Sequence, residues 1–375
     1  MQWLRTNAAS FGGDDRLTIF GESAGATSVT VHLCSRLSRS IFGAAAMESG
    51  AFAYWAALPM HEATQQLNLL LKRTACPDVA CLRALDARNL TLIANNYSVF
   101  ARSAGKHYAT SWAPTVDGIE LTALPGELLA QGQCAPVPLL LGVNRDEGTS
   151  SVEAPNETLL RKGYNMTMAD LHTFFTMWLR NESLVDDALR LYRVGSSPRL
   201  SRPYWAATHL LGDLMFTCPE LRGARHYARA RVDAPVFSYF FDHVPRNPPF
   251  SAGVPGFNGS SGVSHAFELQ FVWQGLPPSW APHGTLVGAD ERLLARTMAM
   301  YWTNFARSGD PNVGSRTPLT VQWPRAQARK VEHAHEKGAI LEALQLDLPS
   351  LSTVTGRASH QCEFIDALGA IPYPV

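Results

Sequence analysis

The sequence has little charge and no excess of either sign. Of its 375 residues only 17% are charged, and 32 lysines and arginines balance 32 aspartates and glutamates. A chain without net charge creates no broad field to attract nucleic acid or an anionic membrane, so we expect neither partner. Hydrophobic residues make up 46% of the chain, which excludes global disorder.

Long hydrophobic runs are also absent. The most apolar stretch, Ala44–Met60, is interrupted by Glu48 and Ser49, and Pro136–Val143 is much shorter than the roughly 18 residues that a membrane span requires. The sequence therefore predicts no transmembrane helix. The residues after Met1 include neither the basic nor the apolar region of a secretory signal, so we predict no signal peptide in the chain as given.

Metal-binding cysteine patterns are missing as well. The six cysteines include no Cys-X-X-Cys pair and no His/Cys cluster at zinc spacing, so we expect no metal and no other cofactor. Disulfide bonds remain compatible with their distribution. The cysteines are Cys34, Cys76, Cys81, Cys134, Cys218 and Cys362.

Six Asn-X-Ser/Thr sequons are present, and such sites accept glycans only in a chain that enters the secretory pathway. They begin at Asn89, Asn96, Asn156, Asn165, Asn181 and Asn258. Glycosylation and secretion conflict with the missing signal peptide. We therefore expect that the sequence begins within a longer, secreted protein.

Segments with helical periodicity alternate with short apolar segments, and no internal repeat or low-complexity linker separates them. This alternation predicts α/β architecture, which we interpret as one domain over residues 1–375 with insertions. Strands are predicted at Leu17–Phe20, Pro136–Val143 and Pro235–Phe241. Helices are predicted at Ala24–Leu33, His61–Arg73, Val79–Ala87, Met168–Arg193 and Glu291–Ala306. We expect a long loop at Asp242–Ser264 and a largely superficial region at Ala326–Arg357.

The pentapeptide Gly21-Glu22-Ser23-Ala24-Gly25 directly follows one predicted strand and opens the next predicted helix. A strand-to-helix turn this tight leaves no room for Cβ atoms at the two glycines, and it lifts the serine hydroxyl clear of the sheet. The helix N-terminus favours a negative charge beside it. The pattern predicts a nucleophilic Ser23, and the alternative is a glycine-rich turn with a buried serine.

A serine nucleophile requires a base and an orienting acid, which α/β-hydrolases supply in the chain order Ser, acid, His. Asp146 and Glu147 directly follow the strand Pro136–Val143, and active sites in such sheets lie at the carboxyl ends of the strands. The spacing does not decide between the two carboxylates. His265 ends the long loop and precedes an apolar run. We predict that one of the two carboxylates and His265 serve Ser23; the alternatives are a polar turn and a surface histidine.

Four longer motifs extend this pattern over nearly the whole chain. Phe11–Gly25 with Met47–Gly50 surrounds the predicted nucleophile, and Leu141–Gly148 surrounds the predicted acid. Gly262–Leu269 contains His265, and Tyr301–Asn312 ends a predicted helix. Together these segments resemble the type-B carboxylesterase and cholinesterase family. The resemblance implies an α/β-hydrolase fold, with a mostly parallel central sheet and helices on both faces.

The resemblance favours Glu147 over Asp146 as the acid, because the family uses the glutamate of its Asp-Glu-Gly element. Ala266 stands where the family usually has glycine. Upstream of the nucleophile the family carries its first strands and a glycine-rich oxyanion loop, which this sequence lacks. We therefore expect an N-terminally truncated member, in which the Ala24 backbone N–H is the identifiable oxyanion donor.

Further roles are implied by the same resemblance. Glu22 is similar to a glutamate beneath the substrate, with a turn carboxylate as the alternative. Trp55 and Trp112 occupy segments similar to the acyl pocket, with core packing as the alternative. The resemblance pairs Cys76 with Cys81 and Cys218 with Cys362, whereas Cys34 and Cys134 have no counterparts, so we expect two buried free thiols.

The expected function is hydrolysis of a small carboxylic ester through a Ser-His-Glu triad and an acyl-enzyme. The alternatives are a cholinesterase-like adhesion or binding module without activity, and an inert fragment. The sequence predicts neither the choice between choline esters, general esters and lipids nor the oligomeric state.

Overall fold

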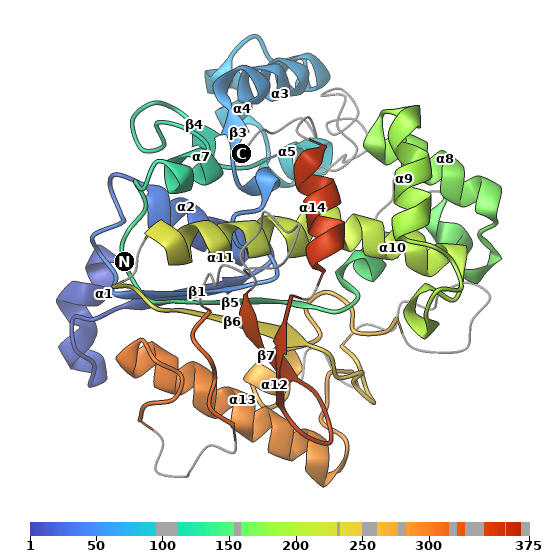
Figure 1. The fold of residues 1–375 in the computed structure, drawn as a ribbon. Coiled ribbons are helices and arrows are strands. Elements are labelled where there is room, and N and C mark those ends of the chain that lie inside the picture. The colour runs from blue at the N-terminus through green and yellow to red at the C-terminus, as the bar shows by residue number, and fades with distance from the viewer. Residues whose placement is uncertain are drawn as a thin grey trace.

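A six-stranded sheet runs through the centre of the molecule in a computed structural model (Figure 1). The structure describes residues 1–94, 112–153, 159–230, 233–249, 261–276, 283–314, 321–326, 341–356 and 358–368. The strand order is β1-β2-β5-β6-β7-β8. The first five strands are parallel and β8 is antiparallel. They are β1 (Thr18–Glu22), β2 (Ala44–Glu48), β5 (Leu139–Asn144), β6 (Val236–Phe241), β7 (Glu342–Leu346) and β8 (Ser352–Thr355).

The inner strands form because their residues are apolar enough to be buried on both faces. Every residue of β2, β5 and β6 is buried, as expected for parallel strands covered on both sides. At the edge of the described sheet, β1 is only partly buried. Register places Glu22 beside Glu48, and Glu48 beside Gly142, so several polar residues gather at the carboxyl ends of the strands.

Helices cover both faces of this sheet. In Figure 1, α2 and α11 lie above the strands, and α12 and α13 lie below them. The helices are α1 (Gln2–Asn7), α2 (Ala24–Cys34), α3 (Met60–Thr74), α4 (Val79–Ala84), α5 (Ala87–Ala94), α7 (Pro125–Ala130), α8 (Met168–Leu179), α9 (Glu182–Leu191), α10 (Pro203–Gly212), α11 (Cys218–Ala230), α12 (Leu269–Val272), α13 (Gly288–Ser308) and α14 (Ser359–Ala367). None of the helices in the described ranges is long and apolar enough to span a membrane.

Short elements complete the fold. A separate pair of parallel strands is β3 (Leu58–Pro59) and β4 (Thr115–Val116). The short helical turns are η1 (Ala8–Phe11), η2 (Tyr54–Ala56), η3 (Glu147–Glu153), η4 (Leu160–Asn165), η5 (Pro198–Leu200) and the π-turn η6 (Asp213–Thr217).

Two hydrophobic cores lie on opposite faces of the sheet. One contains Val29 of α2, Leu141 of β5 and Phe174 of α8. The other contains Phe237 of β6 and Met298 of α13. Because β5 and β6 contribute to both clusters, the sheet joins the two cores. This layered arrangement confirms the predicted α/β-hydrolase fold.

Most predicted elements are present, with three differences. The helix predicted at Val79–Ala87 ends at Ala84, because Leu85 is extended, and α5 begins at Ala87. The helix predicted at Met168–Arg193 is two helices, because Arg180 takes a left-handed conformation with φ of 53° and Asn181 caps α9. The prediction of a largely superficial Ala326–Arg357 is wrong for β7, where Ala343, Leu344 and Leu346 are buried. The short alternation of this strand is too weak a signal to predict it.

Three disulfide bonds are formed. Cys76 pairs with Cys81 and Cys218 with Cys362, as the resemblance implies. The prediction of free thiols at Cys34 and Cys134 is wrong, because these residues form the third disulfide. The Ala135 N–H donates to the Leu33 carbonyl at 2.8 Å, so the end of α2 and the segment before β5 lie side by side.

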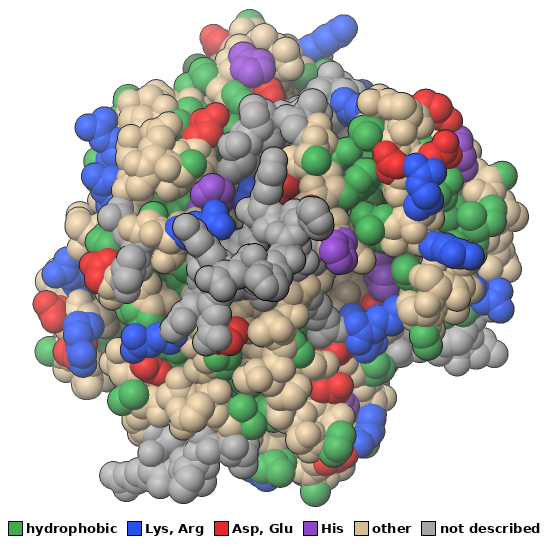
Figure 2. Space-filling model, viewed as in Figure 1, with side chains coloured by type: hydrophobic (Ala, Val, Ile, Leu, Met, Phe, Trp, Pro, Cys, Tyr) green, Lys and Arg blue, Asp and Glu red, His purple; other side chains and the backbone are tan. Residues whose placement is uncertain are grey.

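Charges of both signs are interspersed over the surface. Figure 2 shows lysine and arginine side chains next to aspartate and glutamate side chains across one face. This mixture agrees with the balanced composition of 32 basic and 32 acidic residues.

Candidate active site

Ser23 lies between β1 and α2 in a strained backbone conformation. Its φ is 57° and its ψ is −117°, a combination that costs energy for any residue other than glycine. A Cβ on Gly21 would lie 2.4 Å from the Gly25 carbonyl carbon, and one on Gly50 would lie 2.7 Å from the Ser23 carbonyl oxygen. These two glycines therefore permit the turn that presents Ser23.

The expected reason for Gly25 needs correction. A Cβ added there would meet no atom of the described chain within 4 Å. The backbone of Gly25, rather than its missing side chain, fills the space beside Gly21. The Ser23 N–H donates to the Glu48 carbonyl at 2.9 Å, which ties the turn to the end of β2.

His265 and Glu147 form a direct pair. His265 Nδ1 lies 2.7 Å from Glu147 Oε2, and the other carboxylate oxygen of Glu147 accepts the Asn144 N–H at 2.6 Å. Glu147 is 1% exposed. Burial disfavours the imidazolium, but the charge and hydrogen bond of Glu147 together with the charge of Glu22 raise the pKa of His265 above its usual value.

Asp146, the other candidate acid, points elsewhere. Its carboxylate contacts His209 at 3.0 Å, accepts from Arg145 Nε at 2.9 Å and accepts the Val263 N–H at 2.8 Å. Burial would raise the pKa of Asp146, but the His209 hydrogen bond and the Arg145 charge lower it to about 2. Asp146 therefore anchors the loops that carry Glu147 and His265.

Glu22 contacts the second nitrogen of the imidazole. Glu22 Oε1 lies 3.1 Å from His265 Nε2, and the hydrogen bonds of the described residues include none between Ser23 Oγ and His265. Burial raises the pKa of Glu22 to about 7, although the charge of His265 opposes the rise. The imidazole is thus bracketed by two carboxyl groups, a contact that motif spacing could not reveal.

Three more carboxyl groups are buried near these residues. Glu48 accepts the Trp302 indole N–H at 3.0 Å, Glu220 accepts the Gly50 and Ala51 N–H groups at 3.4 Å, and Glu268 accepts from the Asn144 side chain. Burial raises the pKa of Glu48 to about 8, and it raises the pKa values of Glu220 and Glu268 well above their usual value. Burial therefore favours the neutral form of each of these three carboxyl groups, which lie around the pair of His265 and Glu147.

Two comparisons with known proteins bear on this arrangement. Residues 1–345 match the sequence profile of the Carboxylesterase family. Over 344 residues the chain is 32% identical to a protein named Cholinesterase from Mus musculus, and the match covers 86% of this chain and 53% of that relative. The chain belongs to the carboxylesterase family. It spans about half the length of the curated relative it matches.

An aromatic wall lies beside the imidazole of this carboxylesterase-family chain. The Phe216 ring is 4.6 Å from the His265 ring, and Trp55 lies edge-on to Phe216 at 5.9 Å. Trp55 therefore contacts Phe216, which in turn contacts His265. Trp112 is 46% exposed, and its indole N–H is directed to the Ala94 carbonyl at the end of α5 rather than to the histidine. No sequence motif pointed to Phe216.

Ala24, the residue after the candidate nucleophile, begins α2 and is exposed. Its N–H belongs to the first turn of the helix, where the backbone offers no acceptor. This geometry is the usual one for a donor to an anion at a helix N-terminus.

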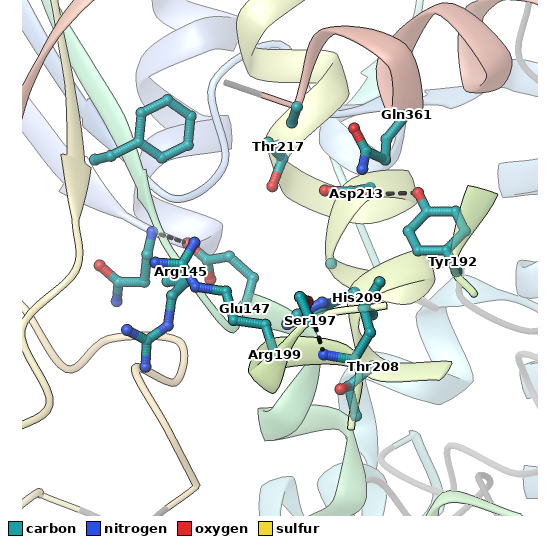
Figure 3. Close-up of a pocket in the computed structure, with 15 residues that line it drawn as sticks. Arg145, Glu147, Tyr192, Ser197, Arg199, Thr208, His209, Asp213, Thr217 and Gln361 are labelled. Atoms are coloured by element: carbon teal, nitrogen blue, oxygen red, sulfur yellow. Dashed lines mark hydrogen bonds between the residues drawn. The ribbon is translucent and has the colours of Figure 1, made fainter. Parts of the chain in front are cut away.

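A cavity of about 190 Å³, lined mostly by polar residues, has Glu147 in its wall. Figure 3 shows Tyr192 donating to Asp213 on one wall, with Glu147 and Arg145 on the opposite side. Burial raises the pKa of Asp213 to about 6, although the Tyr192 hydrogen bond opposes this. Within the described ranges no three His, Cys, Asp or Glu side chains converge as they would around a metal ion.

The predicted glycosylation sites divide into two groups. Asn89, Asn165 and Asn181 are exposed, although the Asn181 side chain also accepts from Ser183 as the cap of α9. Asn96, Asn156 and Asn258 lie outside the described residues.

Proposed function

We propose that this chain carries the catalytic triad of a carboxylic ester hydrolase, with Ser23 as nucleophile, His265 as general base and Glu147 as orienting acid. The observation that carries the proposal is the 2.7 Å contact between His265 and Glu147, next to a serine on a strained strand-to-helix turn. Membership of the carboxylesterase family supports ester hydrolysis as the reaction class.

In the proposed first step, His265 Nε2 takes the proton of Ser23 Oγ while that oxygen bonds to the ester carbonyl carbon. The negative charge that develops on the carbonyl oxygen is stabilised by the Ala24 N–H and by the dipole of α2. The bond to the alkoxy group then breaks, the alcohol leaves with the proton from His265, and an acyl-Ser23 remains.

Water completes the cycle in the reverse sense. His265 takes a proton from water, the oxygen attacks the acyl carbon, and Ser23 leaves with the proton as the acid is released. Glu147 keeps the Nδ1 proton in place and stabilises the imidazolium in both halves. Glu22 lies 3.1 Å from Nε2, so its charge also favours the imidazolium.

Trp55 belongs to this proposal as a wall of the acyl pocket, because it packs against the Phe216 ring that covers His265. Trp112 has less support, since its indole group points to α5.

Hydrolysis of p-nitrophenyl acetate by the full chain and by Ser23→Ala tests the proposal. We expect turnover in the wild type and its loss in the variant, because the covalent step needs the hydroxyl. Ser40→Ala, at an exposed serine between α2 and β2, serves as the matched control and should retain full activity. Equal turnover by wild type and Ser23→Ala would rule out the esterase function and favour a binding module.

A further inference from the structure

One helix beside the active site contains a wide turn. α10, η6 and α11 run without interruption from Pro203 to Ala230. The Cys218 N–H donates to the Asp213 carbonyl five residues earlier, which is the hydrogen bond of a π-helix rather than an α-helix. The extra residue changes which side chains of this helix face the sheet.

A proline accounts for the wide turn. Pro219 lies four residues after Met215, and proline has no N–H to donate to that carbonyl. The proline ring also clashes with the carbonyl four residues earlier in a regular α-helix. The backbone therefore widens just before Pro219 and leaves the Met215 carbonyl without its helical partner.

A residue from a distant segment donates to this carbonyl. The Trp55 indole N–H, from η2, donates to the Met215 carbonyl at 3.2 Å. Trp55 is 7% exposed, so this hydrogen bond lies in a largely dry environment, where an unsatisfied carbonyl would be costly. The bond fixes the π-turn against the segment that follows β2.

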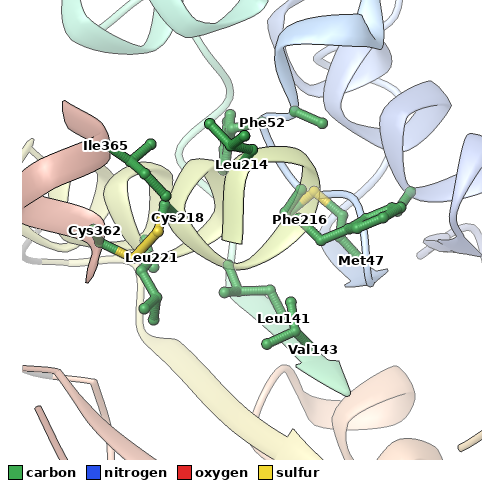
Figure 4. Close-up of a cluster of buried hydrophobic side chains, with 14 of the residues drawn as sticks. Met47, Phe52, Leu141, Val143, Leu214, Phe216, Cys218, Leu221, Cys362 and Ile365 are labelled. Atoms are coloured by element: carbon green, nitrogen blue, oxygen red, sulfur yellow. A yellow bond between two sulfur atoms is a disulfide. The ribbon is translucent and has the colours of Figure 1, made fainter. Parts of the chain in front are cut away.

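The π-turn places Phe216 against the candidate catalytic histidine. The rings of Phe216 and His265 are 4.6 Å apart and inclined by 37°, and Phe216 is 5% exposed. Figure 4 shows Phe216 within a buried cluster beside Met47. The Phe216 ring is therefore held by its neighbours and cannot move away from the imidazole freely.

We infer that Phe216 is a positioning residue for His265, held in place by the π-turn and by Trp55. The inference rests on the proposed esterase function. A hydrogen bond between Glu147 and Nδ1 restrains one atom of the imidazole but still allows the ring to tilt. A flat side chain packed on the ring removes that freedom, so Nε2 keeps its direction while Nδ1 stays on Glu147.

Kinetics separate positioning from acyl recognition. We expect Phe216→Leu to lower kcat roughly 10- to 100-fold, the usual cost of a misplaced catalytic group, with KM changed less than about threefold. The loss should be the same for p-nitrophenyl acetate and butyrate. Phe216→Tyr, which keeps the ring, should retain most activity. A loss expressed in KM, or one that differs between the two esters, would overturn the inference and assign Phe216 to the acyl pocket.

Phe174→Leu is the matched control, because Phe174 is a fully buried ring of α8 and belongs to none of the candidate catalytic groups. It should lower stability without lowering kcat. If Phe174→Leu lowered kcat as much as Phe216→Leu, the effect would be general loss of packing and the inference would fail. Phe216→Met, an unbranched apolar replacement, provides a second test if the leucine variant does not fold.

A spectroscopic test does not depend on turnover. The proton between His265 Nδ1 and Glu147 should give a far-downfield proton NMR signal, assigned by its loss in His265→Gln. These spectra are recorded in the Ser23→Ala background. We expect a sharp signal when Phe216 is retained or replaced by tyrosine, and a broadened signal in Phe216→Leu. An unchanged signal in Phe216→Leu would overturn the inference even if esterase activity is present. If the proton signal broadens as expected in Phe216→Leu but the chain shows no Ser23-dependent turnover, the proposed esterase function is refuted and the positioning role of Phe216 is not.

Discussion

The turn at Ser23 depends on the absence of Cβ atoms at Gly21 and Gly50. Gly21 faces the Gly25 backbone so closely that a methyl group would lie 2.4 Å from its carbonyl carbon. Backbone atoms cannot yield as the end of a flexible side chain can. The strained φ of Ser23 is therefore maintained by a neighbour two residues earlier.

Gly21→Ala should accordingly reduce the free energy of unfolding by about 1 to 3 kcal/mol, as overpacking does, and should abolish ester hydrolysis. Gly43→Ala is the control, because a Cβ on this exposed glycine meets nothing within 4 Å of the described chain. Urea unfolding and an ester assay on both variants measure the difference. Equal stability of the two variants would contradict the argument.

Glu22 should influence the pH dependence of the reaction. Its charge, with that of Glu147, raises the pKa of His265 against the effect of burial. Glu22→Gln removes one of these charges, so the pKa of His265 should fall and the base form should persist to lower pH. We expect the acid limb of the kcat/KM profile to move to lower pH.

Glu147→Gln should behave differently from Glu22→Gln. This variant should lose roughly 10⁴-fold in kcat, because the imidazole loses its correct tautomer. An acid limb that moves to higher pH in Glu22→Gln would show that Glu22 does not act on His265 through its charge.

At the scale of elements, the disulfide between Cys34 and Cys134 joins the end of α2 to the segment before β5 across a sequence separation of 100 residues. Cys76 and Cys81 are separated by only 5 residues. Because a disulfide restricts the unfolded chain more when it closes a longer loop, the two bonds should differ in their contribution to stability.

Replacing Cys34 and Cys134 by alanine should cost about 4 to 5 kcal/mol of unfolding free energy, and replacing Cys76 and Cys81 about 2 kcal/mol, from the loop-closure entropy. Chemical denaturation of the two double variants measures this order. A larger loss for the Cys76–Cys81 pair would show that native-state packing, rather than loop length, dominates.

Some elements could be predicted from the sequence and others could not. β5 and β6 are continuous apolar runs, and α13 ends at a glycine with φ of 74°, so local pattern was sufficient. α10 is buried almost all round and therefore shows no amphipathic stripe to predict it. Motifs and the family resemblance together predicted Ser23, Glu147 and His265 as a triad, which stays a prediction. They did not predict Phe216, because its place depends on a turn that Pro219 imposes.

At the scale of the whole molecule, three exposed sequons and three disulfides are typical of a chain made for the secretory pathway. We predict glycans on Asn89, Asn165 and Asn181, which are exposed. Protein secreted from eukaryotic cells should lose apparent mass on a gel after glycosidase treatment. Each single Asn→Gln variant should have an apparent mass lower by that of one glycan before the treatment. Unchanged gel mobility would refute the prediction.

Stability should decrease as the pH rises through neutrality. Burial raises the pKa values of Glu48, Glu220 and Glu268 from an ordinary 4.5, so the folded chain keeps protons that the unfolded chain releases. Their stabilising effect is complete below the unfolded pKa and is lost as pH rises toward the folded one. Between its unfolded and folded pKa, each such carboxyl lowers the unfolding free energy by at most about 1.4 kcal/mol per pH unit.

Urea unfolding at pH 5, 6.5 and 8, in wild type and Glu48→Gln, tests this dependence. The variant should show a shallower slope, because a neutral amide replaces one of the carboxyl groups. Stability that rises between pH 5 and pH 8 would contradict the prediction.

The buried acids also change the net charge of the folded chain. A count of 32 basic and 32 acidic residues gives zero formal charge and an isoelectric point near 7.2. A carboxyl group that keeps its proton at pH 7, as the pKa of about 8 allows for Glu48, subtracts from the acidic side of this balance. The native protein should therefore migrate as a cation at neutral pH and focus above the isoelectric point of its own unfolded chain.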